Sequence, residues 1–133
     1  MLIALACVAV AIGAAVKFSS SSDSKKSPST VPHALTRTVT YIVTGDHTNQ
    51  ASITHETPSG TGQPNDVDVP LTRKSDGGAG IQFAFHSGDF VYISAQNSDE
   101  SGAVTCSILA DGQIIATNTA SGAYAIATCK GHA

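Results

Sequence analysis

The sequence has few aromatic and few charged residues, and no stretch with the apolar periodicity of an amphipathic helix. Aromatic residues make up 5% of the 133 residues and tryptophan is absent, so a core must be built from Val, Ile, Leu and Ala. With 13% charged residues and a net charge of −3, the chain lacks the basic patch of a nucleic-acid-binding protein. This composition favours one small extracytoplasmic β domain over an α/β enzyme.

The signatures of common catalytic sites are also missing. No Gly-x-Ser-x-Gly elbow singles out a nucleophilic serine. The glycine-rich run DGGAG at residues 76–80 lacks the Lys-Ser/Thr of a phosphate-binding loop and a following helix, and we interpret it as a plain loop. The carboxylates of Asp46, Asp99 and Glu100 lie at turns, and no pair of them has a reason to hold split pKa values. We therefore predict that the protein is not an enzyme and has neither catalytic residues nor a cofactor.

Histidine is the one residue type that invites a metal interpretation. The sequence contains five histidines, namely His33, His47, His55, His86 and His132. None belongs to an HxxxH, HxH or CxxC arrangement of the kind that makes a metal site specific. His47 and His55 flank a predicted hairpin and would approach each other there, but solvated turn histidines are the favoured interpretation. We predict no metal site.

Short alternating runs separated by turn residues predict β-strands along the rest of the chain. In residues 38–44, Val39, Tyr41 and Val43 share one face, and residues 51–56 are expected to pair with this strand. Long loops are predicted at residues 57–66 and 72–80. The remaining predicted strands cover residues 67–71, 81–85, 90–95, 104–110, 113–116 and 124–129. The pattern predicts an all-β fold, an immunoglobulin-like β-sandwich of about seven strands.

The segment 103–129 predicts a three-stranded meander. Asp111-Gly112 between apolar residues is a strong hairpin signal, since both central positions of the favoured turn need a positive φ. Strand alternation turns Cys106 and Cys129 inward. In one flat sheet, the first and third strands would be roughly 9.5 Å apart, beyond the ~7 Å limit for a disulfide. A Cys106–Cys129 disulfide therefore requires the chain to change sheets between them; the alternative is two free buried thiols.

The N-terminal region has a different character. Residues 2–16 are unbroken apolar residues. As a helix they would span about 22 Å, and they are fewer than the ~20 residues that a membrane span needs. No Lys or Arg precedes them. We expect a longer natural N-terminus and an uncleaved membrane anchor at residues 1–17, with a cleaved signal or a lipoprotein modified at Cys7 as alternatives. Residues 18–36, rich in Ser, Pro and Lys, predict a flexible tether. Residues 37–133 then form the extracytoplasmic domain.

Several motifs in fixed order resemble the mycobacterial membrane protein small (MmpS) family. They are VTYIVTGD at 39–46, ASITH at 51–55, VYISAQ at 91–96 and VTCSI at 104–108, followed by Asp111-Gly112 and Cys129. The resemblance runs from Val39 to Cys129, and the leading apolar segment with a polar tether fits it as well. The missing N-terminal cytoplasmic flank and Cys7 depart from the family pattern.

The resemblance implies a single-pass protein of the cell membrane with its C-terminal domain outside the cytoplasm. Its partner would be an MmpL-type transporter of the resistance-nodulation-division class in the same membrane. Such an accessory protein would assist the export of siderophores or cell-envelope lipids. The alternative is a tethered or secreted binding or adhesion module that has no transporter partner, because a fold does not fix a function.

Overall fold

The computed structural model describes residues 35–73 and 75–133, and these form an all-β, two-sheet sandwich. The predicted anchor, Cys7 and nearly all of the predicted tether lie outside the described residues. Among the residues described, no helix has the length and apolar character needed to cross a membrane. The strands are β1 (Thr36–Asp46), β2 (Gln50–Thr57), β3 (Gly60–Gly62), β4 (Val67–Asp68), β5 (Ile81–His86), β6 (Phe90–Asn97), β7 (Ala103–Ala110), β8 (Gln113–Ser121) and β9 (Ile126–His132).

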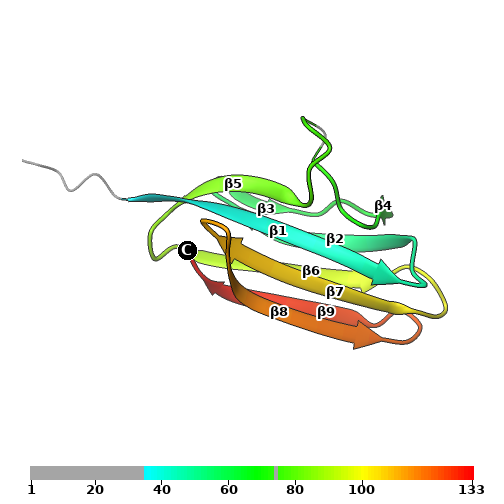
Figure 1. The fold of residues 1–133 in the computed structure, drawn as a ribbon. Helices are drawn as coiled ribbons and strands as arrows, with labels where there is room; N and C mark the ends of the chain where they lie inside the picture. The colour runs from blue at the N-terminus through cyan, green and yellow to red at the C-terminus, as the bar shows by residue number, and fades with distance from the viewer. Residues whose placement is uncertain (1–34, 74) are drawn as a thin grey trace, which may run out of the picture. The chain divides into compact units, whose positions relative to one another are not determined.

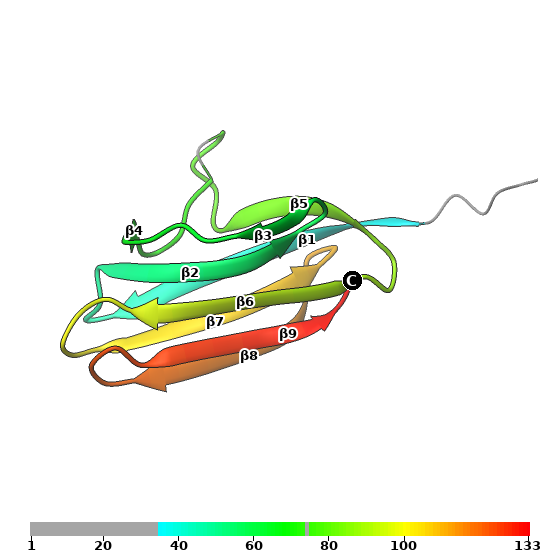
Figure 2. The same ribbon diagram turned by 180° about the vertical axis from the view of Figure 1, so that it is seen from behind.

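The two sheets are antiparallel and have four and five strands. Sheet A has the order β5-β1-β7-β8, and sheet B has the order β3-β2-β6-β9 with β4 also paired to β2. Figures 1 and 2 show the two layers, with β8 facing β9 along one side and β5 facing β3 along the other. The described part of the chain thus has nine strands rather than about seven, because β3 and β4 are very short additions to the edge of sheet B.

The core lies between the sheets and follows the predicted alternation. Val39, Tyr41 and Val43 are fully buried on β1, as the period of two predicts. The other fully buried large apolar side chains include Ile53, Val91, Ile93, Val104 and Ile108. Val, Ile and Ala supply most of the core as expected, but the largest fully buried side chain is that of Tyr41.

The β7–β8 hairpin is confirmed, whereas the meander is wrong. Ala110 pairs with Gln113 across the turn, and Asp111 and Gly112 have φ values of 49° and 80°, as the predicted turn requires. After β8 the chain crosses from sheet A to sheet B, where β9 pairs with β6. The change of sheets that a disulfide requires therefore takes place between the two cysteines.

Cys106 on β7 and Cys129 on β9 form the predicted disulfide, with their Cα atoms 6.1 Å apart. The bridge ties sheet A to sheet B through the interior of the sandwich, since both cysteines are buried. Disulfides persist in oxidising compartments. The bridge therefore points to an extracytoplasmic location for this domain.

Two local predictions are wrong. The strand at residues 51–56 does not pair with the strand at residues 38–44: β1 pairs with β5 and β7, while β2 pairs with β3, β4 and β6. The chain between them crosses from one sheet to the other instead of forming a hairpin. The predicted loop at residues 57–66 contains β3, where Thr57 pairs with Gly60.

Candidate functional site

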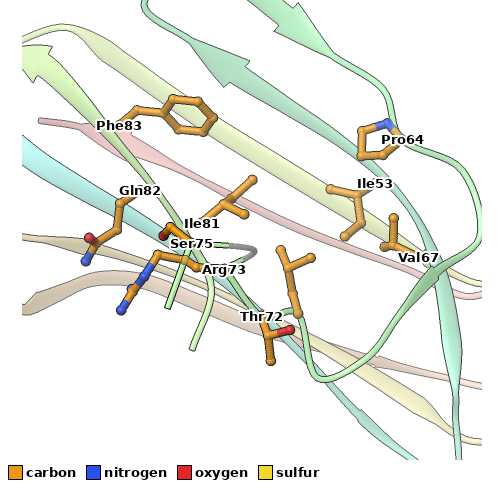
Figure 3. A pocket seen from close by; sticks show the side chains of 10 residues that line it. Ile53, Pro64, Val67, Thr72, Arg73, Ser75, Ile81, Gln82 and Phe83 are labelled. Atoms are coloured by element: carbon orange, nitrogen blue, oxygen red, sulfur yellow. The ribbon is translucent and has the colours of Figure 1, made fainter. Parts of the chain in front are cut away.

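A pocket of about 440 Å³ opens where β5 of sheet A faces the short strands of sheet B. Its apolar walls come from three parts of the chain: Ile53 on β2, the segment around β4 that supplies Val67 and Leu71, and Ile81 and Phe83 on β5. Figure 3 shows Ile53, Val67, Ile81 and Phe83 around one space. A concave apolar site of this size is typical of small-molecule binding sites.

The pocket exists because the two long sides of the sandwich are closed differently. On the β8–β9 side, the Asn118 side chain donates a hydrogen bond of 3.2 Å to the Thr128 carbonyl. Ile115 packs so closely on Gly131 that a Cβ at that glycine would lie 3.2 Å from Ile115 Cδ1. On the β5–β3 side, the facing strand has only three residues. The segments between β3 and β5 cover that side incompletely, and the uncovered space is the pocket.

Arg73 is the charged residue among the described residues of the pocket lining, and its charge is already paired. Its Nε and Nη2 atoms donate to the Asp76 carboxylate at 2.9 and 3.1 Å, and its Nη1 donates to the Ala79 carbonyl at 3.1 Å. The Arg73 guanidinium, by this hydrogen bonding, holds the pKa of the Asp76 carboxyl below its usual range. Figure 3 shows the polar ends of Arg73 and Gln82 turned away from Ile53 and Val67. The pocket therefore has apolar walls, and the charge of Arg73 at its rim is paired with that of Asp76.

Behind Phe83 lies a cluster of rings that we call the aromatic cluster: Tyr41, His55, Phe83 and Phe85. The His55 and Phe83 rings stack with centroids 5.6 Å apart and an interplanar angle of 27°. Tyr41 contacts both rings, with centroids 5.8 Å from that of His55 and 6.1 Å from that of Phe83. Phe83 thus belongs both to the pocket wall and to the aromatic cluster.

Two polar atoms of the aromatic cluster are buried without a hydrogen-bond partner among the described residues, the Tyr41 hydroxyl and His55 Nδ1. Burial raises the pKa of Tyr41 to about 12, and the nearby Tyr92 backbone offsets part of the shift without reaching the geometry of a hydrogen bond. Burial lowers the pKa of His55, against a weaker opposing effect of the Glu56 carboxylate. Both side chains are therefore neutral near pH 7. Buried polar atoms without partners are uncommon and call for an explanation.

The structure separates the two histidines that the sequence placed together. The His47 side chain is 86% exposed in the connection between β1 and β2, whereas His55 is buried on β2. The predicted approach of the two across a hairpin is wrong, because β1 and β2 belong to different sheets. His86 and His132 are exposed, and His33 lies outside the described residues. In the part of the chain that is described, no three His, Cys, Asp or Glu side chains are grouped as metal ligands would be.

The predicted loop at residues 76–80 folds as a structural turn. The Asp76 side chain accepts a hydrogen bond of 2.9 Å from the Gly78 backbone N–H. Gly80, with φ of 72°, is buried against the Tyr41 carbonyl, where a side chain would collide. The loop thus anchors the start of β5 and holds Arg73 at the pocket rim.

Sequence reasoning missed the pocket and the aromatic cluster. The available signal was the alternate apolar residues Val67, Val69 and Leu71 in the predicted strand at residues 67–71, of which the structure forms only Val67–Asp68 as β4. All three are partly buried and pack against the core. The burial of His55 also had a signal, because alternation along β2 places it on the same face as Ala51 and Ile53.

Comparisons with known proteins add no family assignment. No protein-family model matches the chain, and no curated protein matches it either.

Proposed function

We infer that this protein is an accessory to an MmpL-type transporter and assists the export of siderophores or cell-envelope lipids without chemical turnover. The observation that carries the proposal is the ordered set of MmpS-like motifs between Val39 and Cys129. These motifs fall on β1, β2, β6, β7 and β9, which form the centre of both sheets and one edge of sheet B. The resemblance therefore coincides with the structural frame of the sandwich.

The proposal includes an immunoglobulin-like classification and a membrane-anchored topology. Two antiparallel sheets joined through the core by a disulfide support the classification. The apolar residues 2–16 and the polar tether support a single-pass anchor. Anchoring in the bilayer that holds the transporter would raise the effective concentration of the two partners, so that a weak contact would be well occupied.

The pocket at the β5–β3 side favours a second candidate, a tethered or secreted binding module that acts without a transporter. An apolar pocket of about 440 Å³ would let such a module hold a small ligand without any partner protein. The two candidates differ in whether a transporter contacts the protein.

Co-purification tests the proposal. The full chain, carrying an affinity tag after Ala133, is expressed in its native host and extracted in mild detergent, and retained membrane proteins are identified by mass spectrometry. We expect an MmpL-type transporter to be retained. In a variant with residues 2–16 replaced by an unrelated membrane span, the transporter should be lost only if the anchor itself makes the contact. If the unaltered protein retains no such transporter, the result favours the binding module.

A further inference from the structure

We propose that the pocket at the β5–β3 side binds the apolar chain of an uncharged, carbonyl-bearing lipid, an ester or amide, whose carbonyl oxygen is hydrogen-bonded by Tyr41 beyond Phe83. The inference rests on the proposed function in one respect, because it names the class of molecule that an export accessory would hold. Its physical basis is independent of any transporter.

The chain-binding part follows from the shape and lining of the pocket. A water molecule, which is similar in size to a methylene group, takes up about 30 Å³ in the liquid, so 440 Å³ has room for roughly 15 such groups. Ile53, Leu71 and Ile81 offer contact on facing walls. An apolar chain in this space would contact both sheets, because the lining comes from β2, from the segment around β4 and from β5.

The charge pairing at the pocket rim is the reason to expect an uncharged ligand. Arg73 carries the charge of the described lining, and three of its five N–H donors are occupied by Asp76 and by the Ala79 carbonyl. A carboxylate or phosphate on the ligand would share this guanidinium with the Asp76 carboxylate, and the two negative charges would repel each other. An ammonium group would meet no free carboxylate among the described lining residues.

The carbonyl follows from the aromatic cluster. Tyr41 is fully buried and His55 is 6% exposed, yet the Tyr41 hydroxyl and His55 Nδ1 have no hydrogen-bond partners in the described part of the chain. An unmet buried polar atom is destabilising, because it has lost its hydrogen bonds to water and gained none in return. The Tyr41 O–H is a donor, and a carbonyl oxygen is the acceptor that satisfies it without burying a charge.

Phe83 links the pocket to Tyr41, since it lines the pocket and its ring centroid lies 6.1 Å from that of Tyr41. Its ring lines the pocket and stacks on His55, and its side chain is partly exposed. A rotation of this one side chain would extend the pocket to the aromatic cluster. The Tyr41 hydroxyl is buried from solvent, so a lipid carbonyl that reaches it is bound in a dry site where a hydrogen bond is strong.

Photolabelling of the full chain in lipid vesicles tests the proposal. The probes are methyl dodecanoate with a diazirine at the far end of its chain and a hydrocarbon of equal length with the same diazirine, and labelled peptides are mapped by mass spectrometry. We expect the ester to label residues around Leu71 and Ile81, with unlabelled ester competing. Label confined to residues 1–34, or spread evenly over the surface, would overturn the proposal.

Two substitutions separate pocket binding from general lipid contact. Leu71→Gln should lower ester labelling about tenfold, while Ile114→Gln, at a side chain that is 66% exposed on β8, should leave labelling unchanged. Equal losses in both variants, or no loss in Leu71→Gln, would contradict pocket binding. Thermal unfolding of each variant establishes that it is folded.

Tyr41→Phe tests the carbonyl contact. We expect labelling by the ester to fall about fivefold, as the loss of one hydrogen bond implies, and labelling by the hydrocarbon to stay the same. Equal effects on both probes would refute the role of the hydroxyl. If these binding tests fail, co-purification of a transporter can still support the proposed function. If no transporter co-purifies, lipid binding in the pocket can still be shown, so the two proposals fail separately.

Discussion

At the scale of single residues, the Cys106–Cys129 bridge restrains the unfolded chain by closing a loop with a sequence separation of 23. The loss of chain entropy in a loop of this length stabilises the fold by roughly 3 kcal/mol. Replacing both cysteines by alanine should lower the free energy of unfolding by about that amount. Urea denaturation of the variant and of the unaltered protein under oxidising conditions measures the difference. Equal midpoints with equal slopes would show that the bridge contributes nothing.

His55 should make stability depend on pH. Burial lowers its pKa in the folded protein below the usual value of 6.5, so the unfolded chain takes up a proton at a higher pH than the folded protein does. The free energy of unfolding is therefore highest above about pH 6.5 and falls as the pH drops toward the folded pKa. Urea denaturation at a series of pH values between neutral and mildly acidic measures this slope.

The matched substitutions are His55→Phe and His47→Asn. The first should flatten the slope between neutral and mildly acidic pH, because the buried titrating group is gone. The second, at an exposed histidine, should keep it. A slope that survives His55→Phe unchanged would mean that another group is responsible.

At the scale of the elements, two turn glycines with similar φ should respond very differently to alanine. Gly112, in the β7–β8 turn, has φ of 80° and open space where a Cβ would lie, so Gly112→Ala costs only backbone strain of about 1–2 kcal/mol. Gly80 has φ of 72°, and its Cβ would also collide with the Tyr41 carbonyl. Gly80→Ala should therefore lower the melting temperature more than Gly112→Ala does, and equal losses would contradict the close approach of the β5 loop to β1.

The same elements show how far the sequence could be interpreted. Alternation identified the buried face of β1, and Asp111-Gly112 identified the β7–β8 hairpin, because both signals are local. The inward-facing cysteines predicted a change of sheets, because a disulfide has a short reach. Strand partners were harder, because nothing local distinguishes a β1–β2 hairpin from a crossing between sheets. The interpretation of His55 as a solvated turn histidine overlooked the alternation that places it on the buried face of β2 with Ile53.

The pocket could not be predicted for a related reason. It depends on the short β3 facing the longer β5, and on loop residues such as Leu71 folding back over that side. These are relations between segments distant in sequence. The sequence shows that the pocket's residues are apolar, but it does not show that they lie close together in the folded protein.

At the scale of the whole molecule, the described residues all belong to one compact unit. Its C-terminal end is part of the fold: Ala133 is buried, its N–H donates to the Asp89 carbonyl at 2.9 Å, and its carbonyl accepts from the Gly88 N–H at 2.7 Å. The residues after Cys129 belong to the domain, because they extend β9 to His132. An export accessory would use this rigid sandwich as its extracytoplasmic part.

The most direct test of the central claim is export itself, measured in a strain that lacks this protein and any homologue of it. Siderophores and cell-envelope lipids in the medium and outer envelope are quantified by mass spectrometry after complementation with the full chain or with an empty vector. The account predicts that at least one of these classes is exported less without the protein and that the full chain restores it. Equal export of both classes with and without the protein would contradict the account.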